Sequence, residues 1–561
     1  MNGCFLLLIT VAYFVFFYFV YGKFLCKVFK IDPSRKTPAY TLYDGIDYTP
    51  TSPYVLFGHH FASIAGAGPI IGPIVASEIG WIPAILWIFI GCVFVGAMHD
   101  FAAMFLSVRN QGKSIAFVIE KLIGYGGRLI FSMFCWATLI LVVAVFGIMI
   151  ADIFVKTPSV ATASILFILM APVFGFFVNR KLMNILVATL IFVPLTFATV
   201  FVGISFPFDL IKLGWVAGEE QCRLVWLAVL GVYIFIASVV PVQWLLQPRD
   251  YLNSFLLYAL LIAGFVGILL FAPSIEQTGY LGMTVHTHNG DTSVFPTLFI
   301  LIACGACSGF HSLVASGTSS KQIASESHIQ PVGYGGMLVE GVLGVMSLLT
   351  VIYLSDVSFG EAVKHPQLAF ADGMSEFITK IGLSRELSHP FISLVLAAFM
   401  MTSLDTATRL GRFVWQEILT GRGTSAEAQI RNPLIKSVFG FLSNSVIASM
   451  IIVGLAGYLA CSGQGTSIWP VFGAANQLLA ALTLLGISLY LIRIKSHSYI
   501  ALIPMLFMMV MSSWGLIDII RTREGVLVYA SGLLLLLTVF LVILAFKRLV
   551  PGAEQKAVND P

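Results

Sequence analysis

Two histidines occur in the same short pattern, once in each half of this 561-residue chain. Residues 58–66 read GHHFASIAG and residues 309–317 read GFHSLVASG, so both copies have the form G-x-H-x5-G. A neutral imidazole can hydrogen-bond an oxygen atom of a solute or take up a proton near neutral pH. The pattern predicts that His60 and His311 hold equivalent places at a binding site.

Glycine, proline and hydroxyl residues surround both histidines and predict helices that are interrupted within apolar segments. Irregular backbone at membrane depth is tolerated only where it is buried in protein or lines a wet cavity. The free N–H groups of a half-helix attract an anion such as a carboxylate, and Gly66 and Gly68 would let it approach closely. In the other copy we expect backbone and hydroxyl contacts from Ser316, Gly317, Thr318 and Ser319. We therefore predict a site between the two segments for a small carboxylate or a peptide.

Ionisable side chains inside apolar segments are the next candidates, because a charge in a bilayer is costly. Asp100 lies well inside its segment with no cation adjacent in sequence, and is the leading candidate to carry a coupling proton. Asp405 is the reserve, although Arg409 is four residues later and could form a structural pair with it. His59, turned about 100° from His60 on a helix, is a third proton-coupling candidate, and Glu340 is a weaker one.

Two further polar stretches have a structural interpretation. Residues 247–251 (QPRDY) predict a tight charged turn at the end of an apolar segment. Residues 469–477 (WPVFGAANQ) open another segment, and the amides of Asn476 and Gln477 need partners in the membrane. We favour helix packing over substrate contact for these two amides.

No constellation typical of an enzyme is present in the sequence. A P-loop, an HExxH motif and a GxSxG motif are all absent. The adjacent pair His59 and His60 would diverge on a helix, and the C-x-x-C at 304–307 has no strand–helix context. We predict no catalytic residue, no cofactor and no metal site.

The composition shows which elements must position these residues. The chain is 58% hydrophobic and 10% charged with a mean hydropathy of +0.95, so the bilayer must be its solvent. The net charge of +4 forms no continuous basic stripe, so we expect membrane lipid and no nucleic acid as a partner. Apolar segments can be drawn at 3–22, 54–77, 81–108, 128–155, 159–178, 182–205, 224–246, 252–272, 295–317, 332–355, 390–408, 437–460, 467–492, 499–520 and 525–547.

The order of these segments predicts an inverted repeat. The two interrupted segments are the second and the ninth, and their odd separation makes them antiparallel, as such a repeat requires. Most of the 31 lysines and arginines fall on one side, which predicts an outside N-terminus and a cytoplasmic C-terminus. The two longest loops, 273–294 and 356–389, are then outside. We predict four regions: 1–53, an extra helix and a cytoplasmic loop; 54–492, the transporter core; 493–550, C-terminal helices; and 551–561, a polar tail.

The chain resembles the carbon starvation protein A family of bacterial inner-membrane transporters. The resemblance rests on the blocks 44–51, 57–69, 247–253, 304–322, 331–337, 402–412 and 469–477. It implies a helical core like that of the amino acid–polyamine–organocation superfamily, and proton-coupled uptake of peptides or pyruvate during carbon starvation. The chain is shorter than the long members of the family, and His99 stands where the family pattern has an uncharged polar residue such as glutamine.

We therefore predict an all-α polytopic membrane protein of about fifteen transmembrane helices that works by alternating access. It would import pyruvate or peptides across the inner membrane with protons. One alternative is a sodium-coupled symporter whose helix-break carbonyls bind the ion. Another is a membrane nutrient sensor, although the sequence contains no soluble output domain. Neither the substrate nor the oligomeric state follows from the sequence.

Overall fold

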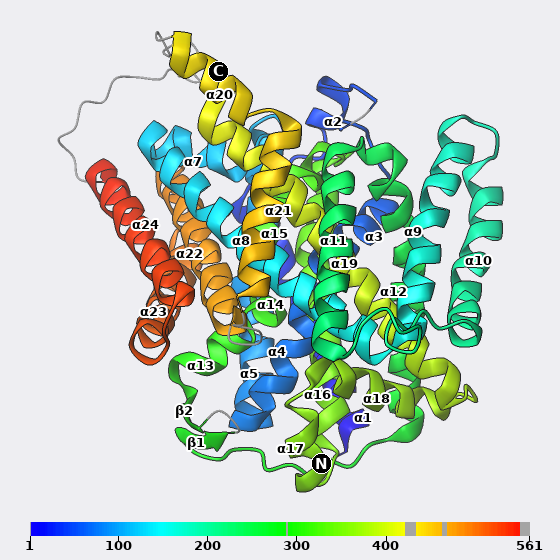
Figure 1. Cartoon of the computed structure of the whole chain (residues 1–561). Helices are drawn as coiled ribbons and strands as arrows, with labels where there is room; N and C mark the ends of the chain where they lie inside the picture. The colour runs from blue at the N-terminus through cyan, green and yellow to red at the C-terminus, as the bar shows by residue number, and fades with distance from the viewer. Residues whose placement is uncertain (1, 46, 288–289, 421–432, 463–467, 550–561) are drawn as a thin grey trace.

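The computed structural model describes residues 2–45, 47–287, 290–420, 433–462 and 468–549, so the predicted polar tail lies outside the described residues. These residues form a helical bundle, as expected (Figure 1). Within them, 12 helices are long and apolar enough to cross a membrane, or 13 if a bent pair counts as one span. The count is below fifteen because two apolar segments do not form one long helix. Residues 295–317 are divided into short helices, and 437–460 contain a 17-residue helix.

The first part of the chain contains α1 (Gly3–Val28), α2 (Pro38–Thr41), α3 (Pro53–Ile64), α4 (Gly68–Ala76), α5 (Trp81–Ile90), α6 (Ala97–Arg109), α7 (Ile115–Ile123), α8 (Tyr125–Lys156), α9 (Pro158–Asn179), α10 (Ile185–Ser205), α11 (Glu219–Val239) and α12 (Leu246–Phe271). Asn2 and Asn184 cap α1 and α10 by accepting hydrogen bonds from backbone N–H groups. Pro53 and Pro158 open α3 and α9, where the missing N–H has no helical partner to lose.

The second part contains α13 (Val294–Leu301), α14 (Ala303–Ala306), α15 (Gly309–Gly317), α16 (Gly335–Ile352), α17 (Asp356–Ala362), α18 (Pro366–Thr379), α19 (Arg385–Thr420), α20 (Pro433–Leu442), α21 (Ser445–Cys461), α22 (Ile468–Arg493), α23 (Tyr499–Thr522) and α24 (Val526–Leu549). Two strands, β1 (Thr284–Thr287) and β2 (Gly290–Ser293), pair antiparallel in register Thr284↔Ser293. This hairpin was not expected in an all-α chain, and α17 and α18 occupy a stretch that we expected to be a loop.

The order of elements is the same in the two halves. A broken segment, α3–α4 or α13–α15, is followed by a span that contains a π-helix: η2 (Gly91–Gly96) between α5 and α6, and η6 (Gln330–Tyr334) before α16. Short helices then lead into α8 or α19, which pack against each other in the bundle. The short helices α7 and α18 lie at opposite ends of the molecule (Figure 1), as an inverted repeat requires. Helices α11 and α12 complete the first half, and α21 and α22 the second.

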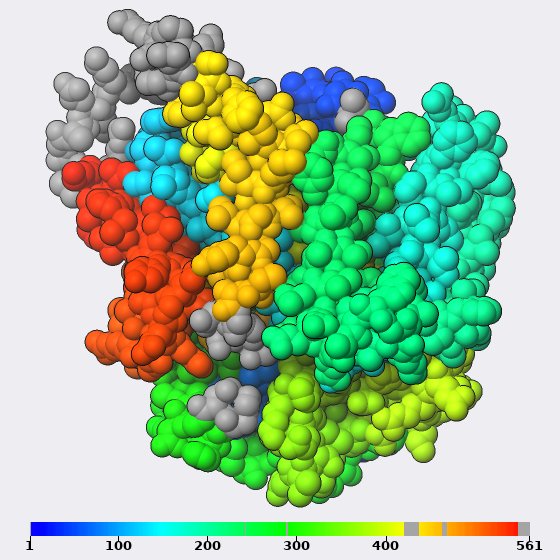
Figure 2. Space-filling view, viewed as in Figure 1, coloured from blue at the N-terminus to red at the C-terminus, as the bar shows by residue number. Residues whose placement is uncertain are grey.

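Apolar side chains remain exposed around the bundle. In Figure 2, α11 and α21 lie side by side on one face, and both pack against α8 and α19. Their outer positions are apolar, for example Val232 and Tyr458. Helices α9 and α10 form a hairpin at one edge, and α23 and α24 lie at the opposite edge (Figure 1). A continuous apolar surface of this extent is expected to contact lipid, so the chain is a multi-pass membrane protein.

The N-terminal end of α1 lies at the same end of the bundle as β1, β2 and α17 (Figure 1). The Gly3 N–H donates to the Pro273 carbonyl at 2.7 Å, which ties the start of the chain to the loop after α12. At the other end, the Arg109 guanidinium donates to the Lys30 carbonyl at 2.9 Å. The loops that we assigned to two sides of the membrane therefore lie at two ends of the bundle.

Candidate transport site

The first interrupted segment consists of α3 and α4, which are bent by 49° across the break between them. Helix α3 ends because Ala65 leaves the helical region, with φ −73° and ψ 68°. Helix α4 begins at Gly68, and Pro69 occupies its first turn. No side chain among the described residues caps the N-terminus of α4. The predicted interruption therefore exists, and it leaves an uncapped half-helix within the buried part of the protein.

The second interrupted segment is broken earlier than we expected. Helix α14 ends at Ala306, and Cys307 and Ser308 are extended before α15 begins at Gly309. The G-x-H pattern thus follows the break here, whereas in the first segment it precedes the break. The prediction that the two histidines hold equivalent places in the repeat was therefore wrong. Because the segments run in opposite directions, both histidines lie on the side where α3 and α15 pack together.

The two broken segments are in direct contact through small residues. A Cβ atom on Gly68 would lie 2.0 Å from Cβ of Cys304, and one on Gly72 would lie 2.4 Å from the Leu301 carbonyl oxygen. Real Cβ atoms do not approach so closely, so a larger residue at Gly68 would force α4 away from α14, and one at Gly72 would force α4 away from α13. The sequence-based expectation that these segments face each other is confirmed.

A small cavity of about 10 Å³ lies between the two breaks. Its wall includes Gly66 and Gly68 beside the first break and Ser308 at the second. Other helices complete the wall with Val142 and Phe146 (α8), Ser403 (α19) and Phe472 (α22). A cavity of this volume has room for about one water molecule. It has no room for pyruvate or a peptide, so the space between the breaks is closed in this structure.

Asn476 of α22 holds the second break in place. Its side-chain oxygen accepts a hydrogen bond from the Phe310 N–H at 2.9 Å, and its amide nitrogen donates to the Ser308 hydroxyl at 3.0 Å. One free N–H group at the start of α15 is thereby satisfied. Asn476 has the packing role that we favoured from its sequence, and it also lies beside the candidate site.

A buried chain of titratable groups crosses the bundle next to α15. Asp100 of α6 has one carboxylate oxygen 2.8 Å from Nδ1 of His99 and the other 2.8 Å from Nδ1 of His311. Nε2 of His311 lies 3.5 Å from the carboxylate of Glu340 on α16. All four side chains are completely buried. The two residues that we singled out separately, Asp100 and His311, are therefore direct partners.

His60 is also buried, and it contacts one of the predicted hydroxyl residues. Its Nδ1 lies 2.8 Å from the hydroxyl oxygen of Ser319, which follows α15. The Ser316 hydroxyl donates to the Ser312 carbonyl, and the Thr318 hydroxyl donates to the Val314 carbonyl. Gly317 ends α15. These residues lie at the end of α15 away from the break, and none of them lines the cavity between the breaks.

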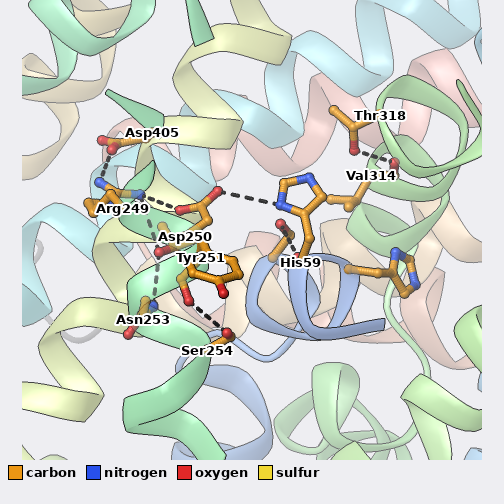
Figure 3. A network of polar contacts seen from close by, with 12 residues as sticks. His59, Arg249, Asp250, Tyr251, Asn253, Ser254, Val314, Thr318 and Asp405 are labelled. Carbon is orange, nitrogen blue, oxygen red and sulfur yellow. Dashed lines mark hydrogen bonds and ion pairs between the residues drawn. The ribbon is translucent and has the colours of Figure 1, made fainter. Parts of the chain in front are cut away.

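Asp405 pairs with a different arginine from the one we expected. Its carboxylate accepts a hydrogen bond from Arg249 at the start of α12 (Figure 3), and another from the Tyr233 hydroxyl. Arg409 instead donates to the Val240 carbonyl at 3.1 Å, where α11 ends. The pair with Arg409, which the spacing in the sequence allowed, is therefore not formed, because a neighbouring helix brings a closer cation to Asp405.

Arg249 also joins Asp405 to a second carboxylate. It donates to Asp250 at 3.1 Å, and the other oxygen of Asp250 lies 3.8 Å from Nδ1 of His59 (Figure 3). His59 lies in the wall of a cavity of about 400 Å³ between α3, α9 and α12. The wall also carries amide and aromatic side chains: Tyr54, Asn179, Gln243, Gln247, Tyr251, Tyr258 and Gln322. We call this cavity the vestibule.

The sequence matches a known family along most of its length. The family model for the carbon starvation protein CstA matches residues 2–367 and 360–515. The chain belongs to the CstA family. This CstA-family chain is 32% identical to the peptide transporter CstA of Bacillus subtilis over 552 residues, which cover 91% of this chain and 89% of that one. It is 29% identical to the pyruvate/proton symporter BtsT of Escherichia coli over 591 residues, 90% of this chain and 80% of that one.

A solved structure shows the same fold at much lower identity. The manganese transporter of Eremococcus coleocola aligns over 91% of this chain and 98% of its own with a TM-score of 0.50 and 10% identity. The likeness supports an inverted-repeat transporter fold for this CstA-family member. In the described ranges, no three or more His, Cys, Asp and Glu side chains are grouped so that they could hold a metal ion.

Sequence reasoning missed two charged residues of this CstA-family site. Arg249 and Asp250 were assigned to a turn, but residues 246–271 form one helix and both side chains are buried. The sequence did contain a sign that these residues belong to a helix. Arg249 and Asp250 come directly before an apolar run, and Pro248 is compatible with the first turn of a helix. Glu340 was noticed as a candidate, but its contact with His311 depends on two separate helices.

Proposed function

We propose that this protein imports small carboxylates or short peptides into a bacterial cell across the inner membrane, driven by protons, with its N-terminus outside and its C-terminus in the cytoplasm. The names of two relatives, a peptide transporter and a pyruvate/proton symporter, support both substrate classes and the coupling ion. The buried acid–histidine chain beside α15 supports proton movement, because these groups can exchange protons inside the bilayer.

The contact between the two breaks is the observation that carries this proposal. The cavity between them holds about 10 Å³, so a substrate can enter only if α4 and α14 move apart. The helix breaks, between α3 and α4 and between α14 and α15, both lie beside this cavity. The two halves of a broken helix can tilt separately. The geometry therefore fits a site that opens and closes as the two repeats move against each other.

The vestibule supplies a route to one side. It is lined by the first turns of α3, the last turns of α9 and the start of α12, at the end of the bundle that carries most of the basic loops. Its volume of about 400 Å³ lies in the range of sites for drug-sized ligands. Pyruvate, with six non-hydrogen atoms, would leave most of this space empty. The amide and aromatic wall suits the backbone and side chains of a short peptide, so we favour peptides over pyruvate as the substrate.

Uptake by purified protein in liposomes tests the proposal. Labelled pyruvate and labelled alanyl-alanine would each be offered under an imposed pH gradient, acid outside, with and without a protonophore. We expect accumulation above the external concentration that the protonophore abolishes. Accumulation that persists with the protonophore and requires sodium would contradict proton coupling. Competition by lactate, amino acids and other dipeptides would then define the substrate class.

A further inference from the structure

Glu340 is a buried carboxylate without a hydrogen-bond partner in the structure. It lies on α16 with a relative exposure of 0%, and neither of its side-chain oxygens accepts a hydrogen bond in the described part of the chain. Asp100 differs in this respect, because each of its oxygens has a histidine partner at 2.8 Å. An ion with no partner in a dry interior is strongly destabilised. The neutral, protonated carboxyl group of Glu340 is therefore the favoured form in this closed state.

His311 connects the two carboxylates. When Asp100 is ionised, it accepts a hydrogen bond from Nδ1–H of His311, which leaves Nε2 facing Glu340 at 3.5 Å. One proton can occupy this gap, either on the carboxyl oxygen of Glu340 or on Nε2 of His311. If that proton leaves, a carboxylate anion faces a bare ring nitrogen. The pair thus has a proton-loaded form that is stable here and an empty form that is not.

Titratable groups on several elements interact electrostatically with Glu340. His311 and Asp100 do so, and so do three thiols: Cys92 on η2, Cys304 on α14 and Cys307 at the second break. His60 on α3 and His99 on α6 are linked to the same chain through Asp100.

All the elements that carry this chain have an irregular backbone. Asp100 follows the π-helix η2, Glu340 follows the π-helix η6, and His311 lies in the first turn after the second break. π-Helices are rare and occur frequently at functional sites. Glycines allow the spans to approach closely, since a Cβ atom on Gly333 would lie 3.3 Å from the backbone of Phe101. Small movements between these spans would change the gap between His311 and Glu340.

The chain also adjoins the candidate substrate site. Phe310, the residue before His311, lines the cavity between the breaks, and so does Cys304. A substrate that separates α4 from α14 would therefore move the first turn of α15, which carries His311. This gives a physical link between substrate occupancy and the distance from His311 to Glu340.

We propose that Glu340 takes up and releases the transported proton, and that His311 passes it between Glu340 and Asp100. In the transfer, the O–H bond of Glu340 breaks and an N–H bond forms at Nε2 of His311, while the N–H bond at Nδ1 of His311 breaks and an O–H bond forms on Asp100. No electron is lost or gained, and the reverse steps return the proton to Glu340. This assignment rests on the proposed function, because it requires proton-coupled transport. It names a residue that sequence reasoning placed behind Asp100, Asp405 and His59.

The test compares two transport modes of Glu340→Gln in liposomes with a clamped membrane potential. For one proton per substrate, a pH difference of one unit supports about tenfold accumulation in the wild type. In the variant we expect the accumulation ratio of labelled pyruvate or alanyl-alanine to fall to about one. Counterflow of the same substrate at equal pH, which needs no net proton movement, should stay within about threefold of the wild-type rate.

Controls separate the possible outcomes. Glu361→Gln, at an exposed acid on α17, should leave both modes unchanged. Glu340→Asp keeps a carboxyl group and should retain coupling at a lower rate. If Glu340→Gln still accumulates substrate in response to the pH gradient, the assignment is overturned. Loss of counterflow in a variant that is folded and monodisperse also overturns it. If the wild type itself ignores the protonophore, the proposed function fails instead, whatever the variant does.

Discussion

Arg249 is the largest side chain that the described structure buries completely. Its guanidinium contacts Asp405, Asp250, Thr402 and Tyr233, so that oxygen atoms from α11, α12 and α19 surround one cation. A buried cation is stable only when such partners replace the water it has lost. At the scale of single residues, this cluster joins three helices of the transporter core.

Replacement of Arg249 should destabilise the protein strongly. Arg249→Ala leaves two carboxylates buried without their cation, and breaking a buried pair in this way costs about 3–5 kcal/mol. We expect a marked fall in the thermal unfolding midpoint of the detergent-solubilised protein. The double variant Arg249→Ala with Asp405→Ala should lose less than the two single variants combined.

A surface pair provides the matched control for Arg249. Arg385 donates to Asp372 at 2.7 Å, but both side chains are about half exposed or more. Arg385→Ala should therefore cost about 1 kcal/mol or less. Equal loss in Arg249→Ala and Arg385→Ala would contradict the structural importance of the buried cluster.

At the scale of elements, the contact between α4 and α14 decides whether the candidate transport site can close. Gly68 and Gly72 leave no space for a side chain, while Cys304 fills the position opposite Gly68. Glycine is needed here for close approach of two backbones, since neither residue has a positive φ. The two broken segments form one unit although their contacting residues are far apart in sequence: Gly68 and Cys304 are 236 positions apart, and Gly72 and Leu301 are 229 positions apart.

Gly68→Ala should reduce transport without preventing folding. The new Cβ atom overlaps Cys304, so we expect the breaks to be held apart and the rate of uptake to fall by about tenfold or more, the effect of about 1.4 kcal/mol on the barrier. Adding Cys304→Gly removes both overlapping atoms and should restore part of the rate. Gly147→Ala on α8 is the control, because its Cβ would lie an ordinary 3.6 Å from Leu227. Uptake by Gly68→Ala at the wild-type rate would argue against this contact.

The vestibule also belongs to the element scale, because α3, α9 and α12 form it together. Val55 lines its wall and is 48% exposed. We expect Val55→Trp to raise the KM for alanyl-alanine offered from the vestibule side by about tenfold, equivalent to about 1.4 kcal/mol. The KM for pyruvate, which is smaller, should change by no more than about twofold. Kinetics of efflux from liposomes of defined orientation check this for the two substrates, and equal effects would mean that the vestibule does not discriminate by size.

At the scale of the whole molecule, the two ends of the bundle differ in charge and structure. One end carries the β1–β2 hairpin, α17 and the start of α1 (Figure 1). The other end carries most of the loops that are rich in lysine and arginine. The bias in lysine and arginine predicts that the basic end faces the cytoplasm. All substrate routes that we propose depend on this orientation, because the vestibule lies at the basic end.

Labelling of introduced cysteines would determine the orientation. In a variant without the eight native cysteines, we expect Tyr280→Cys near the hairpin to react with a membrane-impermeant maleimide in spheroplasts. Lys181→Cys between α9 and α10 should react only after the membrane is permeabilised. Both positions are exposed, so accessibility to the reagent depends on the membrane alone. The reverse result would place the N-terminus in the cytoplasm and make the vestibule an entry site.

Several features of the protein could be predicted because they depend on local properties of the chain. Apolar runs specify membrane helices, since the length needed to cross the bilayer is fixed. Clusters of glycine and proline specified where the helices of 54–77 and 295–317 break, although the second break lies near Cys307 instead of after Ser316. The two broken segments are an odd number of segments apart, which was enough to predict that they are antiparallel. Asp100 and His311 could be singled out because ionisable groups are rare in a membrane.

Only the tertiary structure decided which of these groups are partners. Asp405 pairs with Arg249 on another helix instead of Arg409 on its own, and Glu340 on α16 lies 3.5 Å from Nε2 of His311 on α15. Helix periodicity indicates which residues share a face of a helix, but it does not indicate which other helix of the chain packs against that face. The partners of a buried charge are set by packing between distant segments, where a shift of one ångström makes or breaks a contact. For the same reason, the closed cavity between the breaks could be found only once the whole bundle was assembled.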